Sequence, residues 1–266
     1  MKHNLKIIFI LLALFLITQI TGLWISYKYS LIEELPFGIE KLEVEQESAS
    51  FLPIFIMIII ATFLGLLLMH YKLFNVWRFW FFITVIFTLT ISLSIFIGQI
   101  LALIIAIIFG FLKVYKHNIY IHNLTEIFIY GALAAIFVPI FNIFSIIILL
   151  ILISVYDYIA VRKTKHMVKL AKSQSQTKTF AGFYVPYKKG AAILGGGDIG
   201  FALLFAATII KELSISFFSF KAFVIPFFSA LALLTLFLIG KDKKFYPAMP
   251  FVTAGCLLGY IILIFI

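Results

Sequence analysis

FNIFSIIILLILISVYDYIAV, residues 141–161, is the segment from which the architecture of this chain can be inferred. It is long enough to cross a bilayer, because a helix needs about 17–25 mainly apolar residues to span the hydrocarbon core. Its single charged residue, Asp157, lies five residues before Arg162 and therefore about 7–8 Å from the inner end of such a helix. A charge inside a membrane helix costs about 2.5–3.5 kcal/mol even on insertion scales. We therefore expect a membrane helix that carries a functional carboxyl.

The composition of the whole chain agrees with a lipid environment. Of the 266 residues, 64% are hydrophobic and 12% are charged, whereas soluble domains have about 45–50% apolar and about 25% charged residues. A chain of this size leaves roughly a quarter to a third of its surface exposed after folding, so this apolar content cannot be hidden in a core. The composition excludes a water-soluble globule, a nucleic-acid binder and a disordered chain, despite a net charge of +10. The one cysteine, Cys256, excludes an intrachain disulfide.

Apolar segments of membrane-spanning length recur along the chain. The first ends at an aromatic anchor of Trp24 and Tyr27 and is longer than the about 7–15 apolar residues of a signal peptide, so we interpret it as a retained helix. The uncharged run around Gly98-Gln99 is too long for one helix and is divided there, as Pro139 divides the next run. The nine expected membrane helices are residues 5–27, 52–71, 79–97, 99–115, 124–139, 141–161, 192–210, 219–239 and 246–266.

The distribution of charge gives the expected orientation. Lysine and arginine concentrate in cytoplasmic loops, and with the N-terminus inside, these nine helices place 17 of the 21 basic residues in inside segments, Lys113 among them. We expect an all-α polytopic membrane protein with nine transmembrane helices, a cytoplasmic N-terminus and an extracytoplasmic C-terminus. Its expected parts are six helices in residues 1–161, a cytoplasmic loop at 162–191 and three helices in 192–266.

A second acid lies at a similar depth on the next helix. Asp198 is nine residues after Lys189, at most about 13–14 Å from the inner face, so it can meet Asp157. Two facing carboxyls in a low dielectric share one proton. The ionised member can take a proton from water and the protonated member can donate one to a carbonyl oxygen, as in aspartic proteases. This chemistry requires no metal and no organic cofactor.

The residues around the two acids fit such a site. Gly195, Gly196 and Gly197 precede Asp198 and carry no side chains, so a peptide backbone could approach there. The segment YPAMP, residues 246–250, opens the last expected helix on the same side of the membrane. Its two prolines favour an irregular backbone, which membranes tolerate only where it is buried in protein or lines a watery cavity.

Three short motifs resemble those of a known family. Tyr156-Asp157, the GGGD sequence at residues 195–198 and the PAMP sequence at 247–250 are similar, in order and spacing, to the YD, GxGD and PAL motifs of the presenilin and signal peptide peptidase family of intramembrane aspartyl proteases. The short loops look most like those of archaeal presenilin homologues. Met249 replaces the usual leucine of PAL, and Ile193 stands where presenilins have a lysine.

The resemblance implies both a site and an activity. Asp157 and Asp198 would be catalytic, and the residues expected to support the active site or bind substrate are Tyr156, Gly195, Gly197, Pro247, Ala248, Met249 and Pro250. The protein would hydrolyse peptide bonds within transmembrane helices of substrate proteins. It would lie in the cell membrane with its active site toward the cytoplasm. It would need neither a cofactor nor accessory subunits, and its oligomeric state stays open.

Other polar segments of the sequence indicate less specific roles. The sequence RKTKHMVKLAKS, residues 162–173, predicts a basic amphipathic helix at the membrane surface, with His166 solvated. Residues 180–187, FAGFYVPY, are either an interfacial anchor or a lid or docking strand for substrate. We interpret Glu126 as an interfacial residue, and His122 as part of a polar turn.

Three alternatives remain open at this point. A proton-coupled secondary transporter also has broken helices and membrane carboxylates, although the first half of this chain has no repeat of GGGD or PAMP. Prepilin-type peptidases share the aspartate pair but commonly have a lysine two residues after the second aspartate, where this chain has Gly200. A non-enzymatic scaffold would not need two facing acids. No HExxH or GxSxG motif points to zinc or serine chemistry.

Overall fold

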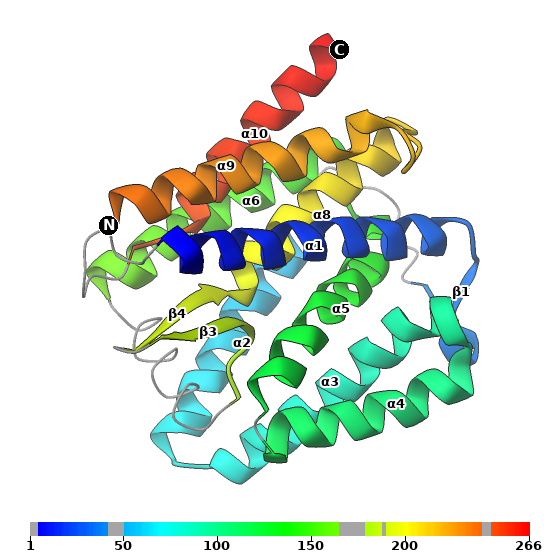
Figure 1. Cartoon of the computed structure of the whole chain (residues 1–266), viewed down its shortest axis with the longest axis vertical. Helices are drawn as coiled ribbons and strands as arrows, with labels where there is room; N and C mark the ends of the chain where they lie inside the picture. Colours follow the sequence, from blue (N-terminus) through cyan, green and yellow to red (C-terminus); the bar gives the residue numbers. More distant parts are fainter. Residues whose placement is uncertain (1–4, 42–50, 117, 165–178, 188–189, 241–245) are drawn as a thin grey trace.

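The computed structural model describes residues 5–41, 51–116, 118–164, 179–187, 190–240 and 246–266. Long helices make up most of it (Figure 1). Within these ranges the α-helices are α1 (Leu5–Ser30), α2 (Phe51–His70), α3 (Phe74–Ile97), α4 (Gln99–Phe111), α5 (Ile119–Phe137), α6 (Ile143–Tyr158), α8 (Gly196–Glu212), α9 (Val224–Ile239) and α10 (Met249–Phe265). π-Helical turns at Leu112–Lys116 and Ile159–Lys163 extend α4 and α6, and 3₁₀ turns occupy Pro36–Gly38, Val138–Ile140 and Phe220–Phe223.

Two small antiparallel sheets accompany the helices. One pairs β1 (Glu34–Leu35) with β2 (Ile39–Glu40), and the other pairs β3 (Gly182–Tyr187) with β4 (Gly190–Gly195). In Figure 1 the β3–β4 hairpin lies on the same side of the molecule as the N-terminus, and β1 lies on the opposite side. The hairpin leads directly into α8, so this sheet lies next to the start of the helix that carries Asp198.

The helices confirm a multi-pass membrane protein that is mostly helical. Counted with their adjoining turns, seven of the described helices are long and apolar enough to cross a membrane. The remaining two, α8 and α10, have 17 residues each. The count of nine crossings, the orientation and the three-part division of the chain stay predictions. The part of the predicted amphipathic helix beyond Thr164, with His166, lies outside the described residues.

The fifth helix begins earlier than the sequence predicted. Asn118 caps α5 by accepting hydrogen bonds from the N–H groups of Tyr120 and Ile121, at 2.9 and 3.2 Å, which is the usual role of asparagine before a helix. The helix therefore starts at Ile119 and not at residue 124. The prediction that His122 lies in a polar turn was wrong, because this cap places it at the end of the first turn of α5.

The seventh helix begins later than predicted. Residues 190–195 are strand β4 and not the first turn of a helix, because their backbone pairs with β3 from Gly182↔Gly195 to Tyr187↔Gly190. Gly195 is the N-cap of α8, which starts at Gly196. The last helix also starts later, at Met249, so that Tyr246–Ala248 remain non-helical as the two prolines predicted.

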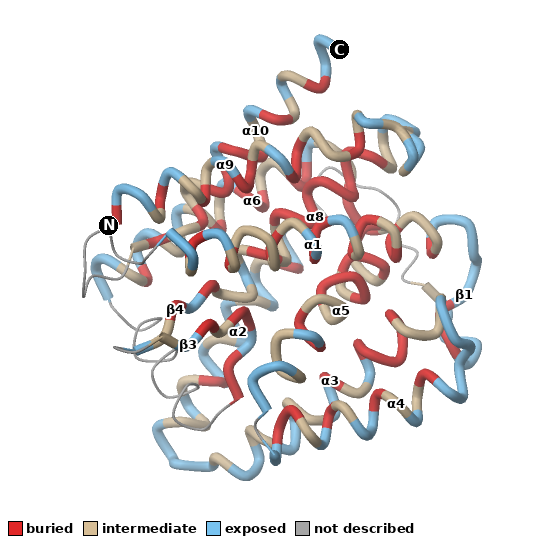
Figure 2. The backbone as a smooth tube through the Cα atoms, in the orientation of Figure 1, coloured by how far each residue is buried: buried red, intermediate tan, exposed pale blue. Residues whose placement is uncertain are grey.

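The core lies where α1 packs against α5, α8 and α9, and Figure 2 shows the buried residues gathered there. Glycine permits the closest approaches: a Cβ on Gly22 would lie 2.2 Å from the Leu203 side chain. On α10, Gly255 and Gly259 form a GxxxG pair against α9, and a Cβ at Gly255 would lie 2.6 Å from the Phe228 carbonyl oxygen. Such small residues let membrane helices pack backbone to backbone.

Candidate active site

Asp157 lies near the end of α6 and is bound by the start of α10. Its Oδ2 accepts a hydrogen bond from the backbone N–H of Met249 at 3.2 Å, and the backbone N–H of Ala248 also donates to this carboxyl. The first N–H groups of a helix have no intrahelical acceptor, and they carry the positive end of the helix dipole. The carboxyl of Asp157 therefore receives the unsatisfied donors of α10.

The PAMP segment explains why α10 begins at this point. Pro247 is buried just before the helix, and Pro250 lies in its first turn, where the missing N–H costs nothing. The Arg162 guanidinium lies over the Tyr246 ring at 5.1 Å and joins this segment to the end of α6. The structure thus brings Ala248 and Met249 to Asp157, and Pro247 and Pro250 flank these two residues in the chain. Tyr156 is half-buried beside it on α6.

Asp198 is the third residue of α8 and is held by the residue that caps the helix. The backbone N–H of Gly195 donates to its carboxyl, and Asp198 interacts electrostatically with Asp157. Both side chains are half-buried. The two acids therefore lie within electrostatic range of each other, and each has a backbone donor at a helix start.

The three glycines before Asp198 differ in what their missing side chains permit. A Cβ on Gly195 would lie 3.0 Å from Asp198 Oδ2, so a side chain there would press on the carboxyl. A Cβ on Gly196 would lie 2.6 Å from the Tyr130 hydroxyl oxygen, which makes this glycine a packing requirement. Gly197 is exposed, and its Cβ would meet nothing closer than Phe201 at 3.9 Å. Only Gly197 leaves open space beside the acid.

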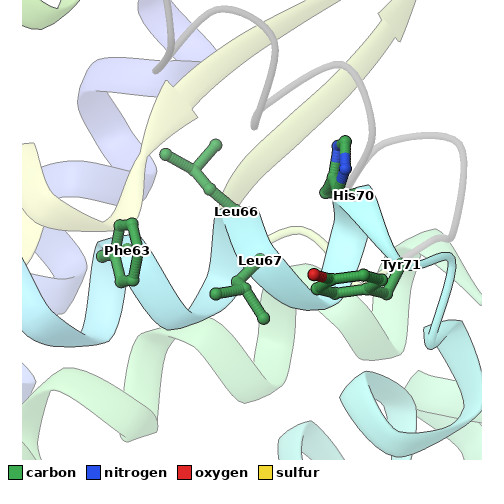
Figure 3. A pocket seen from close by; sticks show the side chains of 5 residues that line it. All are labelled: Phe63, Leu66, Leu67, His70 and Tyr71. Carbon is green, nitrogen blue, oxygen red and sulfur yellow. The ribbon is translucent and has the colours of Figure 1, made fainter.

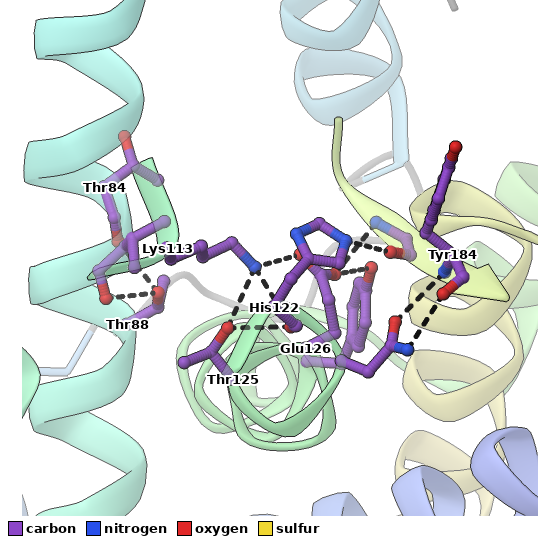
Figure 4. A network of polar contacts seen from close by, with 11 residues as sticks. Thr84, Thr88, Lys113, His122, Thr125, Glu126 and Tyr184 are labelled. Carbon is purple, nitrogen blue, oxygen red and sulfur yellow. Dashed lines mark hydrogen bonds and ion pairs between the residues drawn. The ribbon is translucent and has the colours of Figure 1, made fainter. Parts of the chain in front are cut away.

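Residues 182–187, within the predicted anchor or docking segment, form strand β3, and its outer edge faces α5. Asn123 donates from Nδ2 to the Tyr184 carbonyl oxygen at 2.9 Å and accepts from the Tyr184 N–H at 3.0 Å. The N–H and C=O of Gly182 are bound in the same way by Glu126 and His122. Figure 4 shows this network with α5 at its centre.

Glu126 is a buried residue, so its interpretation as interfacial was wrong. It is 1% exposed, and its Oε1 lies 2.5 Å from Nζ of Lys113, which is also 1% exposed. Lys113 is therefore an ion-pair partner in the core and not the inside-loop residue that the orientation argument assumed. The error came from the misplaced start of α5, which had put Glu126 at the membrane interface.

One further polar contact near the acids was missed at the sequence level. Gln19 is fully buried on α1, and its Nε2 donates to the carbonyl oxygen of Ile199, next to Asp198, at 3.0 Å. A polar residue within an apolar membrane helix was the available signal, by the same rule that identified Asp157.

An open depression elsewhere does not contribute to this site. It is lined by side chains of α2 and the residue after it, namely Phe63, Leu66, Leu67, His70 and Tyr71 (Figure 3). It contains neither aspartate and none of the residues predicted to support them. The candidate site is therefore the junction of α6, the β3–β4 hairpin, α8 and the start of α10.

Comparisons with known proteins agree with this architecture. Two solved structures of a presenilin family intramembrane aspartate protease share the fold. The one in space group C222 is 19% identical, with a TM-score of 0.67, and the match covers 95% of this chain and 94% of that one. The one in space group P2 is 18% identical, with a TM-score of 0.68, and the match covers 96% of both chains. No curated protein gives a significant match.

A family model connects the sequence itself to these proteases. The model described as signal-peptide peptidase, presenilin aspartyl protease matches residues 12–197. The matched range includes Tyr156 and Asp157 and ends one residue before Asp198, so the second acid rests on its own geometry. Since the match covers well over half of the chain, this protein belongs to the signal-peptide peptidase and presenilin aspartyl protease family.

Proposed function

We propose that this protein is an intramembrane aspartyl protease in which Asp157 and Asp198 are the two catalytic carboxyls. The observation that carries the proposal is that the two acids interact electrostatically while each is bound by a backbone N–H at a helix start. The family match gives the reaction class, and the transporter alternative receives no support from it. The chemistry is carried by these two side chains and a water molecule.

The reaction follows from one proton shared by two acids. The ionised carboxyl accepts a proton from water while the water oxygen bonds to the scissile carbonyl carbon, and the protonated carboxyl donates its proton to the carbonyl oxygen. The tetrahedral intermediate collapses when the C–N bond breaks and the leaving nitrogen takes a proton from the carboxyl that had accepted it. At the same time, the other carboxylate takes back a proton from the hydroxyl that becomes the new carbonyl. The pair ends with one proton, as it began.

The open edge of β4 is the proposed docking edge for the substrate backbone. A substrate helix must unwind before hydrolysis, and unpaired backbone groups in lipid cost several kcal/mol each. In an antiparallel pair the N–H and C=O groups alternate between facing the partner and facing outward. Tyr184 faces outward toward Asn123, so Ile193, its partner in the register, faces outward on the other side. The described residues contribute no third strand there.

This assignment differs from one of the two interpretations of residues 180–187, that of a lid or docking strand for substrate. The outer edge of β3 is occupied by side chains of α5, whereas an added strand along β4 would run toward Gly197 and Asp198. Main-chain hydrogen bonds of this kind read little side-chain sequence. We therefore propose that instability of the substrate helix governs selection more than side-chain identity.

The topology belongs to the same proposal. Nine crossings with a cytoplasmic N-terminus put the hairpin and both acids in the inner half of the cell membrane, with the C-terminus outside. Substrates would then enter with their N-termini outside and be cut in the inner half of their span. No accessory subunit is needed for this chemistry.

Cleavage by the purified protein tests the proposed function. The wild-type chain and Asp157→Ala and Asp198→Ala variants would be placed in lipid vesicles with a model transmembrane substrate, and products would be mapped by mass spectrometry. We expect cleavage by wild type alone, at sites that follow a Gly or Pro pair moved along the inner half of the substrate helix. Cleavage that survives in either alanine variant would contradict the assignment.

A further inference from the structure

The outer edge of β3 is satisfied by side chains of one helix instead of by another strand. Gly182 donates its N–H to Glu126 Oε2 at 2.9 Å, and its carbonyl oxygen lies 2.8 Å from His122 Nε2. Asn123 binds both main-chain groups of Tyr184. Backbone groups buried away from water need such partners. The three side chains lie on one face of α5 and fix where the hairpin lies against it.

The position of β3 determines where α8, the helix that carries Asp198, begins. Gly182 lies opposite Gly195 in the strand register, and Gly195 is the N-cap of α8 that donates to the Asp198 carboxyl. The next residue, Gly196, donates its N–H to the Ala181 carbonyl oxygen at 3.0 Å. A displacement of Gly182 therefore displaces the cap of α8 and the acid that the cap holds.

Glu126 also reaches α8 through Tyr130. The Tyr130 hydroxyl donates to Glu126 Oε2, the same oxygen that accepts from Gly182. A Cβ on Gly196 would lie 2.6 Å from this hydroxyl oxygen, and one on Gly200 would lie 3.3 Å from the Tyr130 ring. The first turn of α8 thus lies against a ring whose hydroxyl is fixed by Glu126.

Lys113 allows this carboxylate to be buried. Its Nζ lies 2.5 Å from Glu126 Oε1 and 3.0 Å from Thr125 Oγ1 (Figure 4). A buried charge that loses its partner is strongly destabilising. Because Lys113 binds Oε1, Oε2 remains available to Gly182 and Tyr130.

We propose that Glu126 is a positioning residue for Asp198, acting through Gly182 and Tyr130 without touching substrate. The inference rests on the proposed protease function, since its main readout is turnover. A role in stability alone would make activity fall only as far as folding does. A positioning role requires activity to depend on the acceptor that Glu126 offers, even when the charges have been removed.

Two double variants separate these roles. Lys113→Met with Glu126→Gln removes both charges and keeps an oxygen acceptor, whereas Lys113→Met with Glu126→Leu removes the charges and the acceptor. We expect the first to retain kcat within about threefold and the second to lose about tenfold or more, with KM within about threefold in both. A matched control is Ser92→Ala, which removes a hydrogen bond from α3 to the Phe128 carbonyl oxygen of α5 and leaves the bonds between α5 and β3 in place. It should retain wild-type kcat.

Hydrogen exchange gives a readout that does not depend on cleavage. In the Glu126→Leu double variant, backbone amides of β3, β4 and the first turn of α8 should exchange faster, while those of α1, α3 and α9 stay protected. Equal loss of kcat in both double variants, an unchanged kcat in the leucine variant, or faster exchange spread over all helices would overturn the proposal. If wild type does not cleave, or if Asp198→Ala does, the proposed function has failed, and the exchange pattern still tests whether Glu126 holds the hairpin.

Discussion

The backbone N–H of Met249 donates to the carboxyl of Asp157 across 92 positions of the chain. The donor belongs to the main chain, so the side chain at residue 249 is free to vary in chemistry if its volume is kept. We predict that Met249→Leu retains kcat within about threefold, because such volume-conserving changes cost under about 1.5 kcal/mol. Steady-state cleavage and a thermal unfolding midpoint would be measured together. A loss above tenfold with an unchanged midpoint would mean that the thioether itself takes part.

The two acids should fail as a unit. Asp157→Ala and Asp198→Ala should each reduce kcat by about 10³-fold or more. The kcat of the double variant should be no lower than that of the less active single variant, because the effects of groups that act together are grossly non-additive. Asparagine at either position should fail as well, since an amide cannot exchange the shared proton. Multiplying effects in the double variant would indicate two independent roles.

Turnover should have a bell-shaped dependence on pH. One carboxyl must be ionised to activate water, so activity falls at low pH when the pair holds two protons. The other must be protonated, so activity falls at high pH when the pair holds none. The profile of kcat/KM in vesicles would be compared with unfolding measured at each pH. A flat profile over the range in which the fold persists would contradict shared-proton chemistry.

The glycines before Asp198 should separate positioning from substrate access. Gly195→Ala should lower kcat by about tenfold, because its Cβ would lie 3.0 Å from the Asp198 oxygen. Gly197→Ala meets no close atom within the chain, so stability should be unchanged or higher by up to about 1 kcal/mol. Its expected effect is a higher KM, if substrate backbone passes over this residue. Identical kinetics for Gly197→Ala and wild type would remove Gly197 from the substrate path.

The docking edge can be tested by removing one N–H group. Ile193→Pro removes a donor that faces away from β3, so the hairpin's own hydrogen bonds are kept. We predict that KM rises by about tenfold or more, since one exposed substrate carbonyl loses its partner. Ile193→Val, which keeps the N–H, is the matched control. If both variants have the same KM, the substrate backbone does not pair with this edge of β4.

The sequence predicted that Asp157 and Asp198 meet, from depths counted at 1.5 Å per residue. For Asp198 this count ran through residues 190–195, which are strand β4 and not helix, so its depth was not predicted correctly, although the two acids do interact electrostatically. The start of α10 could also be anticipated from Pro247 and Pro250. Catalytic roles for these residues stay predictions, since proximity alone does not show chemistry.

The boundaries around Glu126 and β4 could not be obtained in the same way. Asn118 as a helix cap moved the start of α5 by five residues, which brought His122 and Asn123 into the helix and placed Glu126 about two turns from its start. The AILG residues at 192–195 are as apolar as a helix turn, and only their pairing with β3, a long-range contact, makes them a strand. The hydrophobic pattern of one segment cannot show which distant segment it will pair with.

The side chains of α5 along β3 have a consequence for assembly. Exposed sheet edges allow proteins to polymerise, because each added strand offers a new edge to the next. Here one edge is permanently occupied by Glu126, His122 and Asn123, so the sheet can grow in one direction only. Two copies that met through their β4 edges would form a closed pair with no remaining edge, and a fibre could not propagate. Each hairpin can therefore bind only one added strand at a time. If substrate docks at the β4 edge, the bound strand must dissociate before another can bind.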